Sequence, residues 1–176
     1  LKLPLDDDLR TALKKLPDHD QVFAQSIGQA PVVLGFTLNR ESAQKAADQQ
    51  PSRSLQQQPA RPFRYINTGV PTDRWLHAFA SATTSLPILE RAARGNGAFS
   101  FVPDSDGVVR RVPMVLRLAD QPVSTLVAEL LRVGQGERNF FLRAAEENDT
   151  GLAEVRIGEL RIPTNAHGEM WVHYSE

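Results

Sequence analysis

The stretch that decides the fold is Gly97-Ala98-Phe99-Ser100-Phe101-Val102-Pro103-Asp104-Ser105-Asp106-Gly107-Val108-Val109-Arg110-Arg111-Val112-Pro113-Met114-Val115-Leu116. Two apolar runs with β-strand character flank the turn sequence Asp-Ser-Asp-Gly, and two consecutive arginines follow the turn. This pattern predicts a β-hairpin, and we expect the rest of the chain to pack around it.

Side chains alternate between two faces along a strand, and the run after the turn can be divided in this way. Arg110 is the one charged residue on the face that begins at Val108, whereas Arg111 lies on the opposite face. A half-buried guanidinium is costly unless it is paired, and carboxylates suit its geometry. We therefore expect Arg110 to point inward, where it clamps the turn through Asp104 or Asp106 or lines a pocket at the edge of the core. Arg111 should point outward.

The turn and the two arginines contain the candidate site residues, which are Asp104, Asp106, Gly107, Arg110 and Arg111. In one interpretation the arginines bind an anionic ligand, because guanidinium groups hold anions in bidentate pairs. In the other interpretation the same charges staple the hairpin and form a structural signature. The turn is similar to the start of a calcium loop, but Val115 stands where that loop requires glutamate. Calcium is therefore not expected.

Length, net charge and composition exclude several classes of protein and of site. The chain has 176 residues, enough for one domain, and a formal net charge of -1. A chain with nearly balanced charges does not show the excess of basic residues that is typical of nucleic-acid-binding domains. Cysteine is absent, which excludes disulfides, thiolate zinc sites and a catalytic cysteine. The longest apolar stretches are much shorter than the roughly 20 residues of a transmembrane helix.

The sequence contains no nucleophile elbow, no glycine-rich phosphate loop and no metalloprotease helix. We therefore expect no catalytic residue, no cofactor and no metal. His167 and His173 could approach each other across the last predicted turn, but a zinc site there would lack further ligands.

Helical periodicity, caps and stop signals predict helices over residues 5–16, 18–29, 72–79, 85–94 and 126–133. The residues expected to face the core are Val22, Phe23 and Ile27 in the second helix and Leu126, Val127, Leu130 and Leu131 in the last. Gly95-Asn96-Gly97 should end the fourth helix through left-handed conformations.

Apolar runs predict a strand over 32–36 that is buried on both faces, a strand over 63–66, two strands around Gly158-Glu159 and a last strand over 170–174. Residues 39–62 are rich in glutamine and proline, which indicates a long, mobile polar loop. The predicted fold is α/β: a mixed β-sheet flanked by helices, with antiparallel hairpins in the C-terminal half, in a single domain over 1–176.

At this point the motifs resemble a known family, the CHASE sensor domain of the second type (CHASE2). The residues that carry the resemblance are Leu86-Pro87-Ile88-Leu89, Ala92 to Gly97, Phe101, Asp104 to Pro113, Ser124-Thr125-Leu126 and Glu129-Leu130, with Leu5 to Leu9, Val32 to Phe36, Ile162 to Gly168 and Tyr174 at the two ends. The resemblance covers most of the chain outside the glutamine-rich loop.

This resemblance implies an extracytoplasmic (periplasmic) input module of a bacterial transmembrane receptor. Such modules lie between an amino-terminal transmembrane helix and carboxyl-terminal membrane segments, so contact with the membrane is expected only through flanking segments. The implied outputs are adenylate or guanylate cyclases, histidine kinases of two-component systems, diguanylate cyclases and serine/threonine kinases. The resemblance supplies no ligand and no catalytic residue, and we expect a homodimer in the complete receptor.

Two departures from the family pattern have consequences. His167 stands where the family often has an acid, which argues further against a metal at that turn. Family members also usually begin further upstream, so the resemblance implies a truncated domain whose sheet lacks one or two strands. An exposed sheet edge of that kind could pair with a second copy.

Three functions follow as hypotheses. The first is a sensory input domain, not an enzyme, that binds a small molecule or a partner protein and relays a conformational change. The second is a structural or dimerisation module without a ligand. The third is a hydrolase that uses Asp104 or Asp106 together with a histidine.

Overall fold

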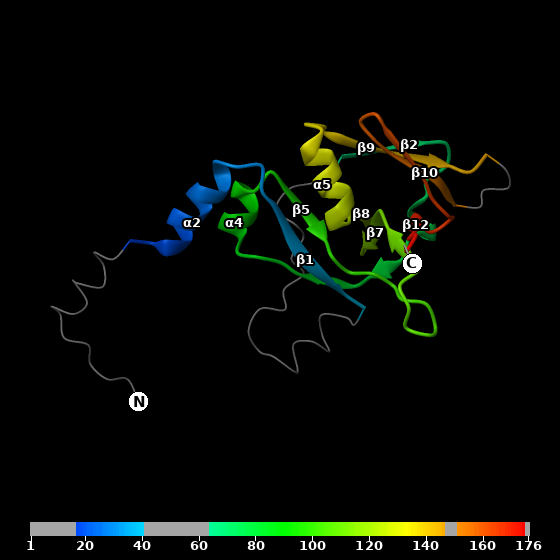
Figure 1. Ribbon diagram of the computed structural model, residues 1–176, viewed down its shortest axis with the longest axis horizontal. Helices are drawn as coiled ribbons and strands as arrows, with labels where there is room; N and C mark the ends of the chain where they lie inside the picture. Colours follow the sequence, from blue (N-terminus) through cyan, green and yellow to red (C-terminus); the bar gives the residue numbers. More distant parts are fainter. Residues whose placement is uncertain (1–16, 41–63, 147–150, 175–176) are drawn as a thin grey trace.

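The structure is a computed structural model that describes residues 17–40, 64–146 and 151–174 (Figure 1). The predicted helix over 5–16 and nearly all of the polar loop over 39–62 lie outside the described residues. The described part is α/β, with parallel and antiparallel strand pairs, as predicted. None of its helices is long and apolar enough to cross a membrane.

The strands of the described residues form four small sheets rather than one. The first has the order β4(Ser81–Thr83)-β1(Val33–Asn39)-β5(Gly95–Ala98), and the second has the order β11(Leu160–Pro163)-β10(Leu152–Ile157)-β9(Asn139–Ala144)-β2(Arg64–Thr68). The third is β3(Ala78–Phe79)-β7(Val115–Leu118)-β8(Gln121–Ser124), and the fourth is β12(Glu169–Trp171)-β6(Arg111–Pro113). The predicted strands near 32–36 and 63–66 and the hairpin around Gly158-Glu159 are confirmed.

Three α-helices and one 3-10 helix lie among the described residues: α2(His19–Gly28), η1(Asp73–Trp75), α4(Pro87–Ala92) and α5(Leu126–Gly134). Asp18 caps α2, because its carboxylate accepts hydrogen bonds from the backbone N–H groups of Asp20 and Gln21. The helix predicted over 72–79 is limited to η1. The chain extends after it because Leu76 enters one core cluster and Phe79 the other.

The predicted core faces of α2 and α5 are partly wrong. Val22 and Phe23 are 50% and 55% exposed, and Val127 and Leu130 are 49% and 51% exposed. In α5 the buried residues are instead Ala128 and Glu129. For α5 the reason is its packing partner. This helix lies directly against the glycines of β5, and the face that carries Ala128 fits closely there.

Gly95-Asn96-Gly97 was expected to adopt left-handed conformations, but these residues belong to β5 and pair in parallel with β1. A Cβ at Gly97 would lie 2.5 Å from Cα of Leu126, and one at Gly95 would lie 2.3 Å from Oε1 of Glu129. Glycine is therefore required for the close approach of α5 and not for a turn. Arg132 neutralises the buried Glu129 by donating from Nε to Oε2 at 2.9 Å and from Nη2 to Oε1 at 2.6 Å.

Two hydrophobic clusters form the core, and the run from Met114 to Leu118 contributes to both. Met114 and Val115 pack beneath the sheet of β9 and β10, whereas Leu116 and Leu118 pack with Phe36 of β1. The two clusters divide this run along its length, and Met114, Val115 and Leu116 are apolar at consecutive positions because all three are fully buried.

The hairpin predicted over residues 97–116 is wrong, although its tight turn is present. The first run continues along β1, where Phe99 N–H donates to the Phe36 carbonyl at 3.0 Å. The second run forms β6 and β7, which pair with β12 and with β8 and β3. Neither run pairs with the other: β1, β12 and β3 are distant in sequence and β8 follows β7 directly, and residues 99–110 form a loop between the two runs.

Candidate functional site

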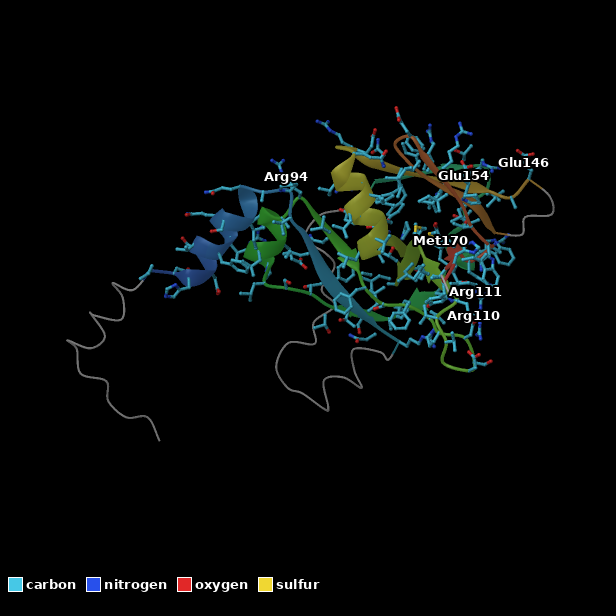
Figure 2. The ribbon with its side chains drawn as sticks, in the orientation of Figure 1. Arg94, Arg110, Arg111, Glu146, Glu154 and Met170 are labelled. Atoms are coloured by element: carbon cyan, nitrogen blue, oxygen red, sulfur yellow. The ribbon has the colours of Figure 1, made fainter. Side chains whose placement is uncertain are left out.

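The loop over 99–110 borders a cavity of about 550 Å³ beside β6 and β12. The cavity is lined by His77, Val102, Pro103, Asp104, Ser105, Asp106, Arg110, Arg111, His167 and Glu169. Figure 2 places Arg110 and Arg111 together at this end of the molecule, near Met170 of β12 and well away from Arg94. Four of the five predicted site residues therefore line one cavity. The fifth, Gly107, occupies the adjacent turn with a φ of 80°.

Arg110 holds the turn together from the outside. It donates from Nη1 to Oδ2 of Asp104 at 3.1 Å and to Oδ1 of Asp106 at 3.0 Å, and from Nη2 to Oδ2 of Asp106 at 2.8 Å. The pairing with the turn aspartates matches the expectation, but the inward orientation is wrong, because the side chain is 45% exposed. Strand alternation does not apply at this position, since β6 begins only at Arg111.

Arg111, which was expected to point outward, makes the more interior contacts. Its Nη2 donates to Oδ1 of Asp104, and its Nη1 lies 3.5 Å from Oε2 of Glu169. The guanidinium also lies 5.6 Å from the ring centre of Trp171, its register partner on β12. Arg111 thus connects the loop carboxylate to the last strand of the sheet.

Glu169 is the buried anion of the site, with a side chain only 3% exposed. Nε2 of His77 lies 2.9 Å from its Oε1, and Nδ2 of Asn165 donates to its Oε2 at 2.8 Å. Because a carboxylate only accepts hydrogen bonds, the His77 nitrogen that faces Glu169 carries a proton. Together with Arg111, these groups compensate the buried charge.

The two histidines of the cavity are in contact, with ring centres 5.2 Å apart and planes 31° apart. Nδ1 of His167 donates to the backbone carbonyl of Trp75 at 2.7 Å. This bond fixes the proton on Nδ1, because a carbonyl cannot donate. The structure therefore pairs His167 with His77, and not with His173 as the sequence suggested. No group of three metal-ligating side chains forms within the described ranges.

The two arginines lower the pKa values of the loop carboxyl groups, Asp104 and Asp106. Hydrogen bonds from Arg111 and then Arg110 lower the pKa of Asp104, and hydrogen bonds from Arg110 and from the Val108 N–H lower the pKa of Asp106 to about 2. Carboxylates with such low pKa values are weak proton acceptors at neutral pH. The site is therefore suited to binding polar groups and poorly suited to general-base chemistry by Asp104 or Asp106.

Sequence reasoning missed His77 and Glu169 as members of the site. His77 meets Glu169 across 92 residues of chain, and no local pattern marks such a contact. The turn before β12 did contain a signal, since Asn165 accepts from the N–H groups of His167 and Glu169 in the manner of an Asx turn.

Comparison with known proteins identifies one family. A family model described as the CHASE2 domain matches residues 5–176 of the chain. No curated protein and no solved structure matches the chain.

Proposed function

Because the chain belongs to the CHASE2 domain family, whose members are extracytoplasmic sensory domains of membrane receptors, we propose that its cavity beside Arg111 receives the signal as a small polar ligand. The observation that carries this proposal is the convergence of Arg110, Arg111, His77, His167 and Glu169 on one cavity of about 550 Å³. Cavities of this size accept small molecules, and a few convergent polar groups orient them.

The chemistry of the cavity favours a ligand that carries both hydrogen-bond donors and acceptors. Its walls hold three carboxylates, two guanidiniums and two imidazoles. A zwitterion such as a free amino acid could exchange with the existing ion pairs, because each of its charges would find an opposite partner. An entirely apolar ligand would leave these groups without partners.

Arg111 offers a route from the cavity to the last strand. It contacts Asp104 of the loop and Glu169 of β12, and beyond β12 the Val172 N–H donates to the Arg110 carbonyl at 2.8 Å. A ligand that competes for Arg111 would change the position of β12 relative to the loop. In a receptor with a cyclase or histidine kinase output, such a displacement would be the signal passed through the carboxyl-terminal membrane segment.

A thermal-shift screen with the twenty common amino acids and short dicarboxylates tests the proposal. A ligand at one hundred times its Kd stabilises the domain by about 2.7 kcal/mol. The shift should shrink in Arg110→Gln and persist in Arg94→Gln, whose side chain is exposed elsewhere. A shift unaffected by Arg110→Gln, or the absence of any shift across both panels, would contradict a cavity ligand of this class.

Dimerisation is the second candidate function, and the exposed apolar side chains favour it. Val22 and Phe23 of α2 and Val127 and Leu130 of α5 are each about half exposed. Light scattering of the chain at increasing concentration tests this role. A concentration-dependent dimer that is lost in Phe23→Ser or in Leu130→Ser would identify the helix concerned, and a monomer throughout would rule out self-association by the isolated chain.

A further inference from the structure

A row of side chains crosses the outer face of the second sheet at one level. In the strand registers, Ile66 of β2 is opposite Phe141 of β9, Phe141 is opposite Arg156 of β10, and Arg156 is opposite Arg161 of β11. The inner face of the same sheet carries the buried Phe140, Leu142, Val155 and Ile157. Strand alternation therefore directs this row toward solvent.

The pairing of Arg156 with Arg161 is unfavourable in isolation. Two like charges directly opposite each other on antiparallel strands destabilise the sheet. Neither guanidinium forms an ion pair with any residue in the described part of the chain. Glu154, a carboxylate on the same strand as Arg156, forms its ion pair with Arg143 instead, at 3.6 Å.

The charges border a hollow of about 190 Å³, which is lined by Thr68, Phe141, Arg143, Glu154, Arg156 and Arg161. Three guanidiniums and one carboxylate leave an excess of two positive charges, on a chain whose formal net charge is -1. The guanidinium of Arg156 lies 4.0 Å from the ring centre of Phe141, which holds it in place. The hydroxyl of Thr68 adds a neutral donor.

We propose that this hollow is a binding site for a phosphate-class oxyanion, held between Arg156 and Arg161. A tetrahedral dianion matches the excess of two charges and accepts bidentate hydrogen bonds from both planar guanidiniums. Binding would also remove the repulsion between the two opposed arginines. The site shares no residue with the cavity at Arg111, so it does not depend on the function proposed above.

Two sources can supply this chemistry: a soluble phosphate ester or the headgroup of an anionic phospholipid. Calorimetry of the full 176-residue chain with glycerol 3-phosphate at low salt measures the first source. Co-sedimentation with vesicles of phosphatidic acid, whose phosphomonoester headgroup can carry two charges, measures the second, with phosphatidylcholine vesicles of zero net charge as the reference. Binding in either arm that depends on the two arginines supports the site and identifies its source.

The variants make the test specific. Arg156→Gln and Arg161→Gln should each weaken binding about tenfold or more, as expected for loss of one charged hydrogen-bond donor. Glu154→Gln should tighten binding, because it removes a negative charge from the hollow. Arg94→Gln is the matched control on another surface and should bind as the wild type does.

A second measurement needs no ligand. Without an oxyanion, Arg161→Gln should be at least as resistant to urea as the wild type, because the substitution removes a like-charge pair from an exposed position. Failure of both probes to bind, binding that survives Arg156→Gln and Arg161→Gln, or binding lost in Arg110→Gln instead would overturn the proposal.

Discussion

Nε2 of His77 lies 2.9 Å from Oε1 of Glu169, and these two residues join η1 and its following segment to the last strand of the domain. Glu169 is buried, so its charge depends on His77, Asn165 and Arg111 for compensation. The cavity is consequently built around one buried carboxylate and its three partners, of which His77 and Arg111 come from distant parts of the chain.

Glu169→Gln should destabilise the domain by about 2 kcal/mol, because an amide nitrogen would replace one of the accepting oxygens and face a donor. Urea denaturation monitored by tryptophan fluorescence measures the change. Glu159→Gln is the control, since Glu159 is exposed in the turn between β10 and β11. Equal midpoints for the two variants would show that the contacts of Glu169 add nothing to stability.

Arg111→Ala should lower the melting temperature more than Arg110→Ala. Arg111 contacts the buried Glu169 and the Trp171 ring as well as Asp104, whereas Arg110 contacts only the exposed side of the turn. This order is the reverse of the one that strand alternation predicts. Thermal denaturation of both variants decides between the two orders, with Arg94→Ala as the surface control.

Acid should weaken the loop through Asp106 and Asp104. The pKa of Asp106 is about 2 in the folded domain and about 3.9 in an unfolded chain. Its contribution is therefore complete above about pH 4 and is lost as the pH falls through the folded value. The pKa of Asp104 is also lowered in the folded domain, so its contribution to stability is likewise lost as the pH falls.

Urea midpoints measured between pH 6 and pH 2 test this behaviour. Asp106→Asn should flatten the decline below pH 4, because the residue no longer titrates. An identical decline in Asp106→Asn and the wild type would assign the acid sensitivity to other groups.

Gly97→Ala should cost about 3 kcal/mol of unfolding free energy, because its Cβ would lie 2.5 Å from Cα of Leu126 and α5 would have to move. Gly134→Ala is the matched control at the end of the same helix, where no atom lies within 4 Å of the added Cβ. That substitution should be neutral or stabilise the domain by up to about 1 kcal/mol. Comparable losses in both variants would mean that helix packing on β5 is not the cause.

Local signals predicted the elements that depend on local physics. Asp18 marked the start of α2, Pro87 the first turn of α4, and Gly158 the hairpin between β10 and β11. The turn at Asp104 to Gly107 and its pairing with Arg110 were also predictable, because all its partners lie within six residues. The family resemblance drew on the same short motifs and is confirmed over residues 5–176.

The errors have a common physical cause. The two apolar runs around the turn were predicted to pair with each other, but the first pairs with β1, and the second pairs with β12 and β3 and with the adjacent strand β8. The same choice of partners exposed Arg110, turned Arg111 toward Glu169 and brought Gly97 against α5. Strand alternation assigns a side chain to a face only after the partner strand is known.

The sequence by itself determined the turn at Asp104 to Gly107, the helix caps, the hairpin between β10 and β11 and the motifs of the family, because these follow from propensities and contacts within a few residues. The tertiary structure alone decided which strands pair, which face each helix buries, and that His77, Arg111 and Glu169 share a cavity. It also decided that Ile66 of β2 stands opposite Phe141 of β9 on one sheet face. Contacts of this kind span long stretches of chain, and the free energy that selects them comes from burying surfaces that no local window contains.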